Sequence, residues 1–215
     1  MPKELAKELS KELPKDVSSN EIWVNKFTED SASKFRKDIL DQKKTSDHSP
    51  IIIYIDSYGG YVDSLAQMID TMDEFRLKYD MKFITVCMGK AMSCGAILLS
   101  HGDTRFCAPN SRVMVHEVSA GAFGDVHDVS NDAKETKRLN EHFLGILAEN
   151  CNIKGGFKGL RQIIKDRDGR DIWMSAQESL DFGIVDFVGY PDIKTVISYD
   201  IVNLKDEGGP KKKKK

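Results

Sequence analysis

The stretch "KFITVCMGKAMSCGAILLS", Lys82–Ser100, decides the fold of this chain. Its first part, "KFITVCM", is largely apolar, which is typical of a strand buried on both faces of a sheet. The second part, "AMSCGAILLS", predicts a short buried helix from Ala91, which the polar "HGD" at 101–103 ends. A buried strand that leads directly into a helix is the repeating unit of an α/β protein.

The same unit precedes this stretch. A continuous apolar run, "IIIYI" at Ile51–Ile55, predicts another buried strand, and the "DSYGG" that follows ends it. The next helix is indicated by apolar residues at helical spacing, namely Val62, Leu65, Ile69, Met72 and Phe75. Further upstream, we expect a first strand at Ile22–Val24 and a helix over residues 31–42.

Strands and helices continue to alternate after Ser100. "DTRFCAPNS" predicts a strand and a turn, and "RVMVHE" predicts another strand. One long helix is expected from Asp125 to about Asn150, followed by a glycine-rich loop, "NIKGGFKG" at 152–159. Residues 171–188 predict a short strand, a helix and an exit strand. This order implies an α/β fold with a largely parallel sheet and right-handed crossovers.

Composition limits the classes of function. The chain has 215 residues, 40% of them hydrophobic and 31% charged, which suits one domain with a real core or at most two small ones. A net charge of −2 gives no general reason to expect nucleic acid or membrane as a partner. The N-terminus lacks the apolar core of a signal peptide, and the four cysteines show no metal spacing, so we expect a cytoplasmic protein with free thiols.

The two ends of the chain differ from the middle. Leu5, Leu9 and Leu13 recur between Lys and Glu, which predicts a short amphipathic helix that ends near Pro14. The tail "EGGPKKKKK" invites an anionic partner, but solvated disorder is the more common outcome for such a run. We therefore expect a variable helical segment at 1–20, a folded domain at 21–204 and a disordered basic tail at 205–215.

Ser93 lies at the predicted turn from strand to helix. A serine there has its hydroxyl raised from the sheet, and the neighbouring amide N–H groups point to where an oxyanion would form. The surrounding "AMSCG" loosely resembles the G-x-S-x-G nucleophile turn, with Ala91 in the place of the first glycine. A serine that caps a helix is more common than a nucleophile, so this motif alone is weak.

A nucleophilic serine needs a base, and His116 is the best placed of five histidines because it ends the strand "RVMVH". A structural role for His116 stays open on this reasoning. Cys94 could be the nucleophile instead, but a small buried thiol with a useful backbone N–H is the more common case. Gly59 and Gly60 offer a second N–H close to a substrate, or form only a turn.

Together these stretches resemble the proteolytic subunit of the Clp protease family. "IIIYIDSYGG" is similar to the family's strand and N-S-P-G-G loop. "VCMGKAMSCGAILLSHGDTRFCAPNSRVMVHEV" is similar to its nucleophile helix, hairpin and histidine strand, and "RDIWMSAQESLDFGIVD" to the segment with its acid. The match covers roughly residues 21–190. It implies an α/β fold of the ClpP/crotonase-like kind, a spiral of repeated β-α units with a protruding handle helix.

The resemblance also implies a site and a reaction. Ser93 would be the nucleophile, His116 the base and Asp171 the orienting acid, with the backbone N–H groups of Gly60 and Cys94 as the oxyanion hole. The expected activity is that of a serine endopeptidase that cleaves peptides or unfolded proteins without a metal or organic cofactor. The expected assembly is a homo-oligomer, a ring of seven subunits, alone or as two stacked rings.

The chain departs from the family pattern at three places. Tyr58 replaces the proline before the two glycines, and Gly169 replaces an acid beside Arg170 that helps to pair two rings in the family. The Lys/Glu-rich residues 1–20 stand where the family has an axial hairpin and an apolar helix. We therefore expect slow cleavage that does not need ATP, and no productive complex with a standard Clp ATPase.

Two other functions stay open at this point. A non-catalytic assembly component would keep the fold without the activity, although the matching serine and histidine speak against it. A crotonase-type acyl-CoA enzyme would use the two amides of the oxyanion hole on a thioester, and coenzyme A binding would test it.

Overall fold

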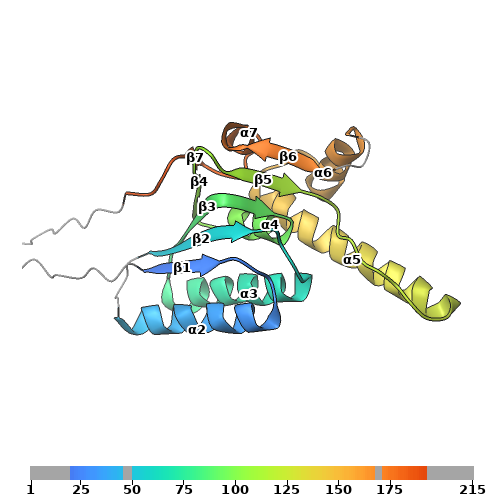
Figure 1. Cartoon of the computed structure of the whole chain (residues 1–215), viewed down its shortest axis with the longest axis horizontal. Helices are drawn as coiled ribbons and strands as arrows, with labels where there is room; N and C mark the ends of the chain where they lie inside the picture. Colours follow the sequence, from blue (N-terminus) through green and yellow to red (C-terminus); the bar gives the residue numbers. More distant parts are fainter. Residues whose placement is uncertain (1–19, 46–49, 168–170, 193–215) are drawn as a thin grey trace, which may run out of the picture.

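The computed structural model describes residues 20–45, 50–167 and 171–192. Strands and helices alternate along the chain (Figure 1). The elements are β1 (Glu21–Val24), α2 (Glu29–Thr45), β2 (Ile51–Ser57), α3 (Val62–Tyr79), β3 (Phe83–Met92), α4 (Cys94–Ser100), β4 (Thr104–Cys107), β5 (Arg112–Val115), α5 (Val126–Asn150), α6 (Gly156–Lys165), β6 (Ile172–Ser175), α7 (Ala176–Asp181) and β7 (Phe187–Val188). The predicted helix at 1–14 and the basic tail lie outside the described residues.

The sheet is mostly parallel, as predicted. Its strand order is β1-β2-β3-β4-β7, and every neighbouring pair on this path is parallel. β5 also pairs in parallel with β3, and β6 completes the sheet as an antiparallel partner of β5. The α/β class is therefore confirmed, with one antiparallel pair at the β5–β6 edge.

β3 is longer than predicted because it serves two neighbours in turn. Its first half, Ile84–Cys87, pairs with β4, and its last part, Lys90–Met92, pairs with β5. The predicted helix start at Ala91 was therefore wrong, since Ala91 and Met92 still belong to the strand and α4 begins at Cys94. The consequence is that Ser93 lies alone between a strand and a helix.

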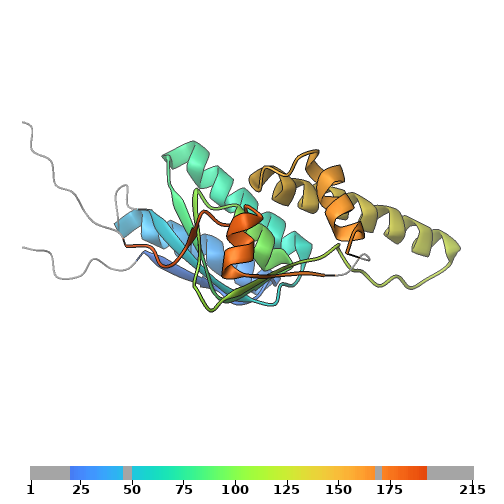
Figure 2. The ribbon, with the colours of Figure 1, turned by 90° about the horizontal axis from the view of Figure 1, so that it is seen from above.

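Helices α2 and α3 cover one face of the sheet (Figure 1; Figure 2 shows the same layers from above). Their inward side chains are fully or almost fully buried together with those of the central strands, and each such burial contributes about 1.5–3 kcal/mol. The largest fully buried side chains also include one from the segment after β1 and one from α4, and they are Phe27, Phe35, Phe75, Phe83, Ile39, Ile51, Ile53, Ile55, Leu65, Met68, Met72 and Leu98. The apolar residues whose spacing predicted these elements therefore form the core.

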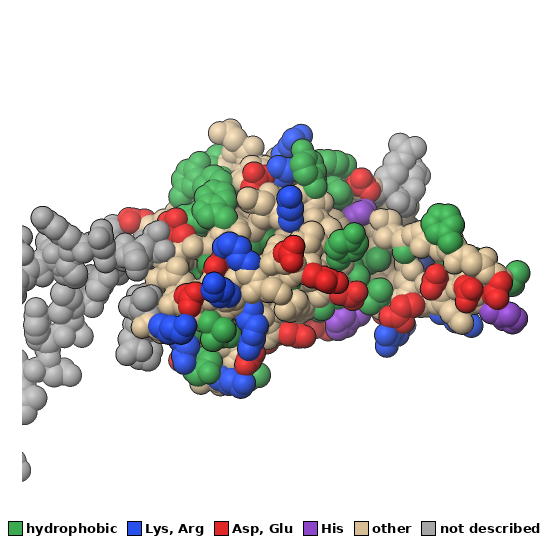
Figure 3. Space-filling model, turned by 60° about the horizontal axis from the view of Figure 1, so that its bottom comes forward, with side chains coloured by type: hydrophobic (Ala, Val, Ile, Leu, Met, Phe, Trp, Pro, Cys, Tyr) green, Lys and Arg blue, Asp and Glu red, His purple; other side chains and the backbone are tan. Residues whose placement is uncertain are grey.

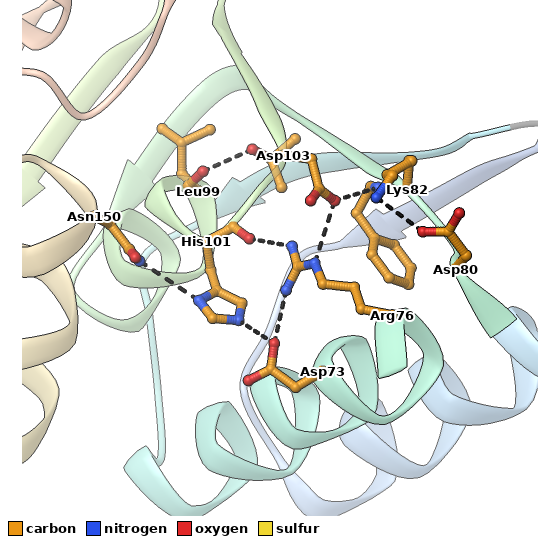
Figure 4. Close-up of polar contacts among 10 residues, drawn as sticks. Asp73, Arg76, Asp80, Lys82, Leu99, His101, Asp103 and Asn150 are labelled. Carbon is orange, nitrogen blue, oxygen red and sulfur yellow. Dashed lines mark hydrogen bonds and ion pairs between the residues drawn. The ribbon is translucent and has the colours of Figure 1, made fainter. Parts of the chain in front are cut away.

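α4 is buried along all seven of its residues and contacts β3, α3 and α5. At its C-terminal end, His101 occupies the cap position, and its ring joins two other helices (Figure 4). His101 Nε2 lies 2.9 Å from Asp73 Oδ1 on α3, and Nδ1 lies 3.5 Å from Asn150 Nδ2 on α5. Arg76 also donates to the His101 carbonyl oxygen. This polar cluster anchors the end of α4 that lies away from Ser93.

α5 projects from the body as a long arm (Figures 1 and 2). Asp125 caps its N-terminus in a capping box with Asp128, and only its C-terminal half buries residues in the core. α6 packs against α5, although the sequence predicted a loop over residues 152–159. That prediction was wrong from Gly156 onward, because the buried Leu160 and Ile164 give this glycine-rich segment an apolar face to pack.

Candidate active site

Ser93 has a backbone conformation that side chains rarely adopt, with φ +55° and ψ −121°. Its N–H donates to the carbonyl oxygen of Met114 on β5 at 2.9 Å, and its own carbonyl accepts from Ala96 at 3.0 Å. β3, β5 and α4 thus fix this residue from three sides. The side chain makes no cap bond to the helix, so its hydroxyl is available to other partners.

One such partner is His116, the residue that follows β5. His116 Nε2 lies 2.8 Å from Ser93 Oγ, within hydrogen-bond distance. Parallel pairing of β3 with β5 sets this contact, because Met92 and Met114 are directly opposed in the register. The two residues that the sequence singled out therefore meet in the fold.

Asp171 stands on the other side of the imidazole but at a longer distance. Its Oδ1 lies 4.0 Å from His116 Nδ1, which makes an ion pair if the ring is protonated and is too long for a hydrogen bond. Asp171 directly precedes β6, and Val115 on β5 is opposite Ile172 on β6. The antiparallel β5–β6 pair thus brings the carboxylate to the histidine, although it lies about 1 Å beyond hydrogen-bond range.

The loop after β2 approaches Ser93 closely, and this approach requires glycine. A Cβ at Gly59 would lie 2.8 Å from Ser93 Cβ, and one at Gly60 would lie 2.4 Å from the Phe27 carbonyl oxygen. The bridge between this loop and Phe27 uses the N–H of Tyr61.

Cys94 is 2% exposed and begins α4. Its thiol donates to the Gly60 carbonyl oxygen at 3.3 Å, so the side chain joins α4 to the glycine loop. Burial is the main cause that raises the pKa of this thiol, which keeps it protonated at neutral pH. The structure therefore gives Cys94 the features of a packed, neutral thiol rather than of a nucleophile.

A cavity of about 240 Å³ opens beside these groups. Ser93 and His116 line it together with an apolar wall from α3, α4 and α5, formed by Val62, Ile97 and Leu144. Sequence reasoning assigned the apolar stripes of these helices to the core and did not detect this wall. The helical spacing contains no signal for it, because only the packing of three helices leaves a gap at that point.

The remaining described histidines lie away from Ser93. His101 is in the polar cluster at the far end of α4, and His127 and His142 are exposed on α5. His48 lies outside the described residues, as do Asp168, Gly169 and Arg170. Among the described histidines, His116 is the one that lines the cavity with Ser93.

The fold is a mostly parallel α/β sheet that holds a serine between a strand and a helix, beside a histidine. The family model described as Clp protease matches residues 17–192 of this chain. The chain therefore belongs to the Clp protease family, which is a family of peptidases. The resemblance stated from the sequence motifs is confirmed. Within the described part of the chain, no helix has the length and apolarity needed to cross a membrane.

Proposed function

We propose that the protein is a serine endopeptidase of the ClpP type, with Ser93 as nucleophile and His116 as general base. The observation that carries this proposal is the 2.8 Å contact between Ser93 Oγ and His116 Nε2 at the wall of a cavity. Two side chains that are far apart in the sequence lie at the distance that proton transfer needs. The metal-free triad chemistry expected from the family supplies the rest of the reaction.

The reaction proceeds by acyl transfer. His116 Nε2 takes the proton of Ser93 as Oγ attacks the peptide carbonyl, and the resulting imidazolium then protonates the leaving amine. Water attacks the acyl-enzyme with His116 again as base, which releases the second product and restores the serine. The N–H groups of Gly60 and Cys94 would bind the oxyanion that forms in each step. The apolar wall of the cavity suits an apolar side chain of the substrate.

Asp171 would orient the imidazole and stabilise its charged form. Its Oδ1 lies 4.0 Å from His116 Nδ1, which is too long for the hydrogen bond that would fix the tautomer of the ring. Catalytic hydrogen bonds are often long in free enzymes and shorten in the complex with substrate. A catalytically silent relative remains the second candidate, and this long contact is the observation that favours it.

The shape of the molecule supports a ring assembly. The projecting half of α5 and the segment before it carry exposed apolar residues, with Phe123 93% and Val126 83% exposed. Figure 3 shows acidic and apolar side chains along the same arm. Exposed apolar residues on a long projection are typical of a surface that another subunit covers. We propose that subunits form a ring of seven around an enclosed chamber, which admits peptides and unfolded chains.

The test is covalent labelling with a fluorophosphonate and cleavage of fluorogenic peptides. We expect the parent protein to be labelled and active, and Ser93→Ala to lose both by at least about a thousandfold while it stays folded. Cys94→Ala is the matched control at the adjacent position, and it should keep activity within about tenfold because only its amide contacts the oxyanion. Peptide cleavage by Ser93→Ala, or an unlabelled and inactive parent, would overturn the proposal.

A further inference from the structure

The loop that follows His116 is bonded to a single amide side chain on α5. The N–H of Val118 donates to Asn140 Oδ1 at 2.9 Å. Asn140 Nδ2 in turn donates to Glu117 Oε1 at 3.2 Å. Asn140 thus contacts both residues that come directly after the histidine, one through its acceptor and one through its donor.

α6 adds a third member to this network. Arg161 Nε lies 3.4 Å from Glu117 Oε1, the same oxygen that accepts from Asn140. The Arg161 and Glu117 side chains are 43% and 40% exposed, so this ion pair by itself adds little to stability. The contact is an ion pair rather than a hydrogen bond, and through it a residue of α6 meets the same carboxylate that Asn140 of α5 contacts.

The network matters because His116 lies beyond the end of its strand. β5 ends at Val115, which is the last residue in register with β6. The backbone of His116 therefore lies outside both ladders of β5, and the residues after it must help to hold it in place. Val118 and Ser119 also line the cavity beside Ser93, so a shift of this loop would move the base and the cavity wall together.

We propose that Asn140, together with Glu117 and Arg161, forms a positioning network that orients His116 and the adjacent cavity wall. Asn140 is the central member because its amide serves two loop residues at once. The inference rests on the peptidase function proposed above and adds residues to its site. None of the three side chains contacts the reacting atoms, and each acts through the loop at 116–119.

The chemistry of the amide leads to a specific exchange experiment. An aspartate at position 140 could still accept from the Val118 N–H, but it has no donor for Glu117 and would repel that carboxylate. A glutamine at position 117 would restore a donor to face the new carboxylate at position 140. Asn140→Asp should therefore be harmful alone and be rescued by Glu117→Gln in the same chain.

The experiment compares full-length parent, Asn140→Asp, Glu117→Gln and the double variant by steady-state peptide cleavage. We expect Asn140→Asp to lower kcat/KM by about tenfold or more, as misplacement of a catalytic group does. The double variant should return to within about threefold of Glu117→Gln. Arg138→Gln is the matched control, because it breaks an exposed ion pair with Glu135 on the same helix and touches no loop residue.

Thermal melting and the His116 imidazole signals in NMR separate this role from others. An Asn140→Asp variant as active as the parent, or no rescue in the double variant, would overturn the inference. An activity loss that only follows the drop in Tm would also overturn it, because the role would then be structural. An inactive parent would contradict the proposed function, but the His116 signals of the variants would still test whether Asn140 positions the ring.

Discussion

At the scale of single residues, the candidate site depends on two backbone positions with positive φ. Ser93 has a positive φ although it is not glycine, and Gly60 has φ +153° with no room for a Cβ. For a residue with a side chain such as Ser93, this conformation costs about 1–3 kcal/mol and persists only where the surrounding structure imposes it, whereas glycine adopts it readily. Here the bonds of Ser93 to β5 and α4, and the contact of Gly60 with Phe27, impose it.

A comparison of two glycines tests this reasoning. We expect Gly60→Ala to lower stability by about 1–3 kcal/mol, because the new Cβ must displace the Phe27 carbonyl oxygen and alanine rarely adopts this φ. Peptide cleavage should fall more than stability does, since the Gly60 N–H would shift. Gly145→Ala is the control, because a Cβ on this α5 residue meets nothing within 4 Å and alanine is favoured in helices. Denaturant unfolding would measure the stability of the two variants, and an equal loss of stability in both would contradict the prediction.

At the scale of secondary-structure elements, Arg105 joins the segments around β4. It donates to both carboxylate oxygens of Asp186, and to the carbonyl oxygens of Asn150 and Gly183. The contacts tie β4 to the end of α5 and to the segment between α7 and β7. Burial alone would raise the pKa of the Asp186 carboxyl, but the hydrogen bonds and charge of Arg105 outweigh it and hold that pKa below its usual range.

This lowered pKa fixes the direction of a pH effect. A carboxyl whose pKa is lower in the folded than in the unfolded state adds stability above its unfolded pKa, and this stability is lost as the pH falls through the folded value. We therefore expect Asp186→Asn to lower the Tm clearly at pH 7 and much less at about pH 3. Glu135→Gln is the matched control, since its pair with Arg138 is exposed. A Tm difference between the parent and Asp186→Asn that grew at low pH would contradict the lowered pKa of Asp186.

A row of apolar residues crosses the sheet from its first strand to its last. Trp23, Tyr54, Val86, Phe106 and Phe187 are in register from β1 to β7. Trp23 stacks on Tyr54 at 4.8 Å between ring centroids, and Phe106 on Phe187 at 5.2 Å. Trp23 and Phe187 remain about half exposed, which is typical of a surface that meets another protein. The expected lack of a productive complex with a Clp ATPase stays a prediction.

At the scale of the whole molecule, the projecting half of α5 and the segment before it predict that subunits assemble. We expect sedimentation velocity to show rings at micromolar concentration, and the double variant Phe123→Asp with Val126→Asp to shift them toward smaller species. Charges on an apolar contact surface weaken it because each must lose water or face another subunit. Peptidase activity should fall with the loss of rings. A parent that is fully active as a monomer would refute the ring assembly.

Much of the fold followed from residue patterns. The apolar run at Ile51–Ile55 and the largely apolar run at Lys82–Met88 predicted the central strands, although the side of β2 that carries Ile52 and Tyr54 is only partly buried. The helical spacing of apolar residues from Val62 to Phe75 predicted α3, because residues at this spacing lie on one face of a helix. The errors came where local pattern is weak. β3 is extended by pairing with β5, and α6 forms on a glycine-rich start because α5 offers a surface to pack against.

The candidate site, like the fold, was predicted from the sequence only in part. The sequence by itself determined the residue types, the turn at Ser93 and, through the family motifs, the set of Ser93, His116 and Asp171. Only the tertiary structure decided their geometry, since strand pairing placed His116 Nε2 at 2.8 Å from Ser93 Oγ and left Asp171 at 4.0 Å from the ring. The cavity wall, the Cys94 bond to Gly60 and the Asn140 network had no sequence signal. The physical reason is that periodicity reports which side of one element is buried, whereas a site forms where several elements meet.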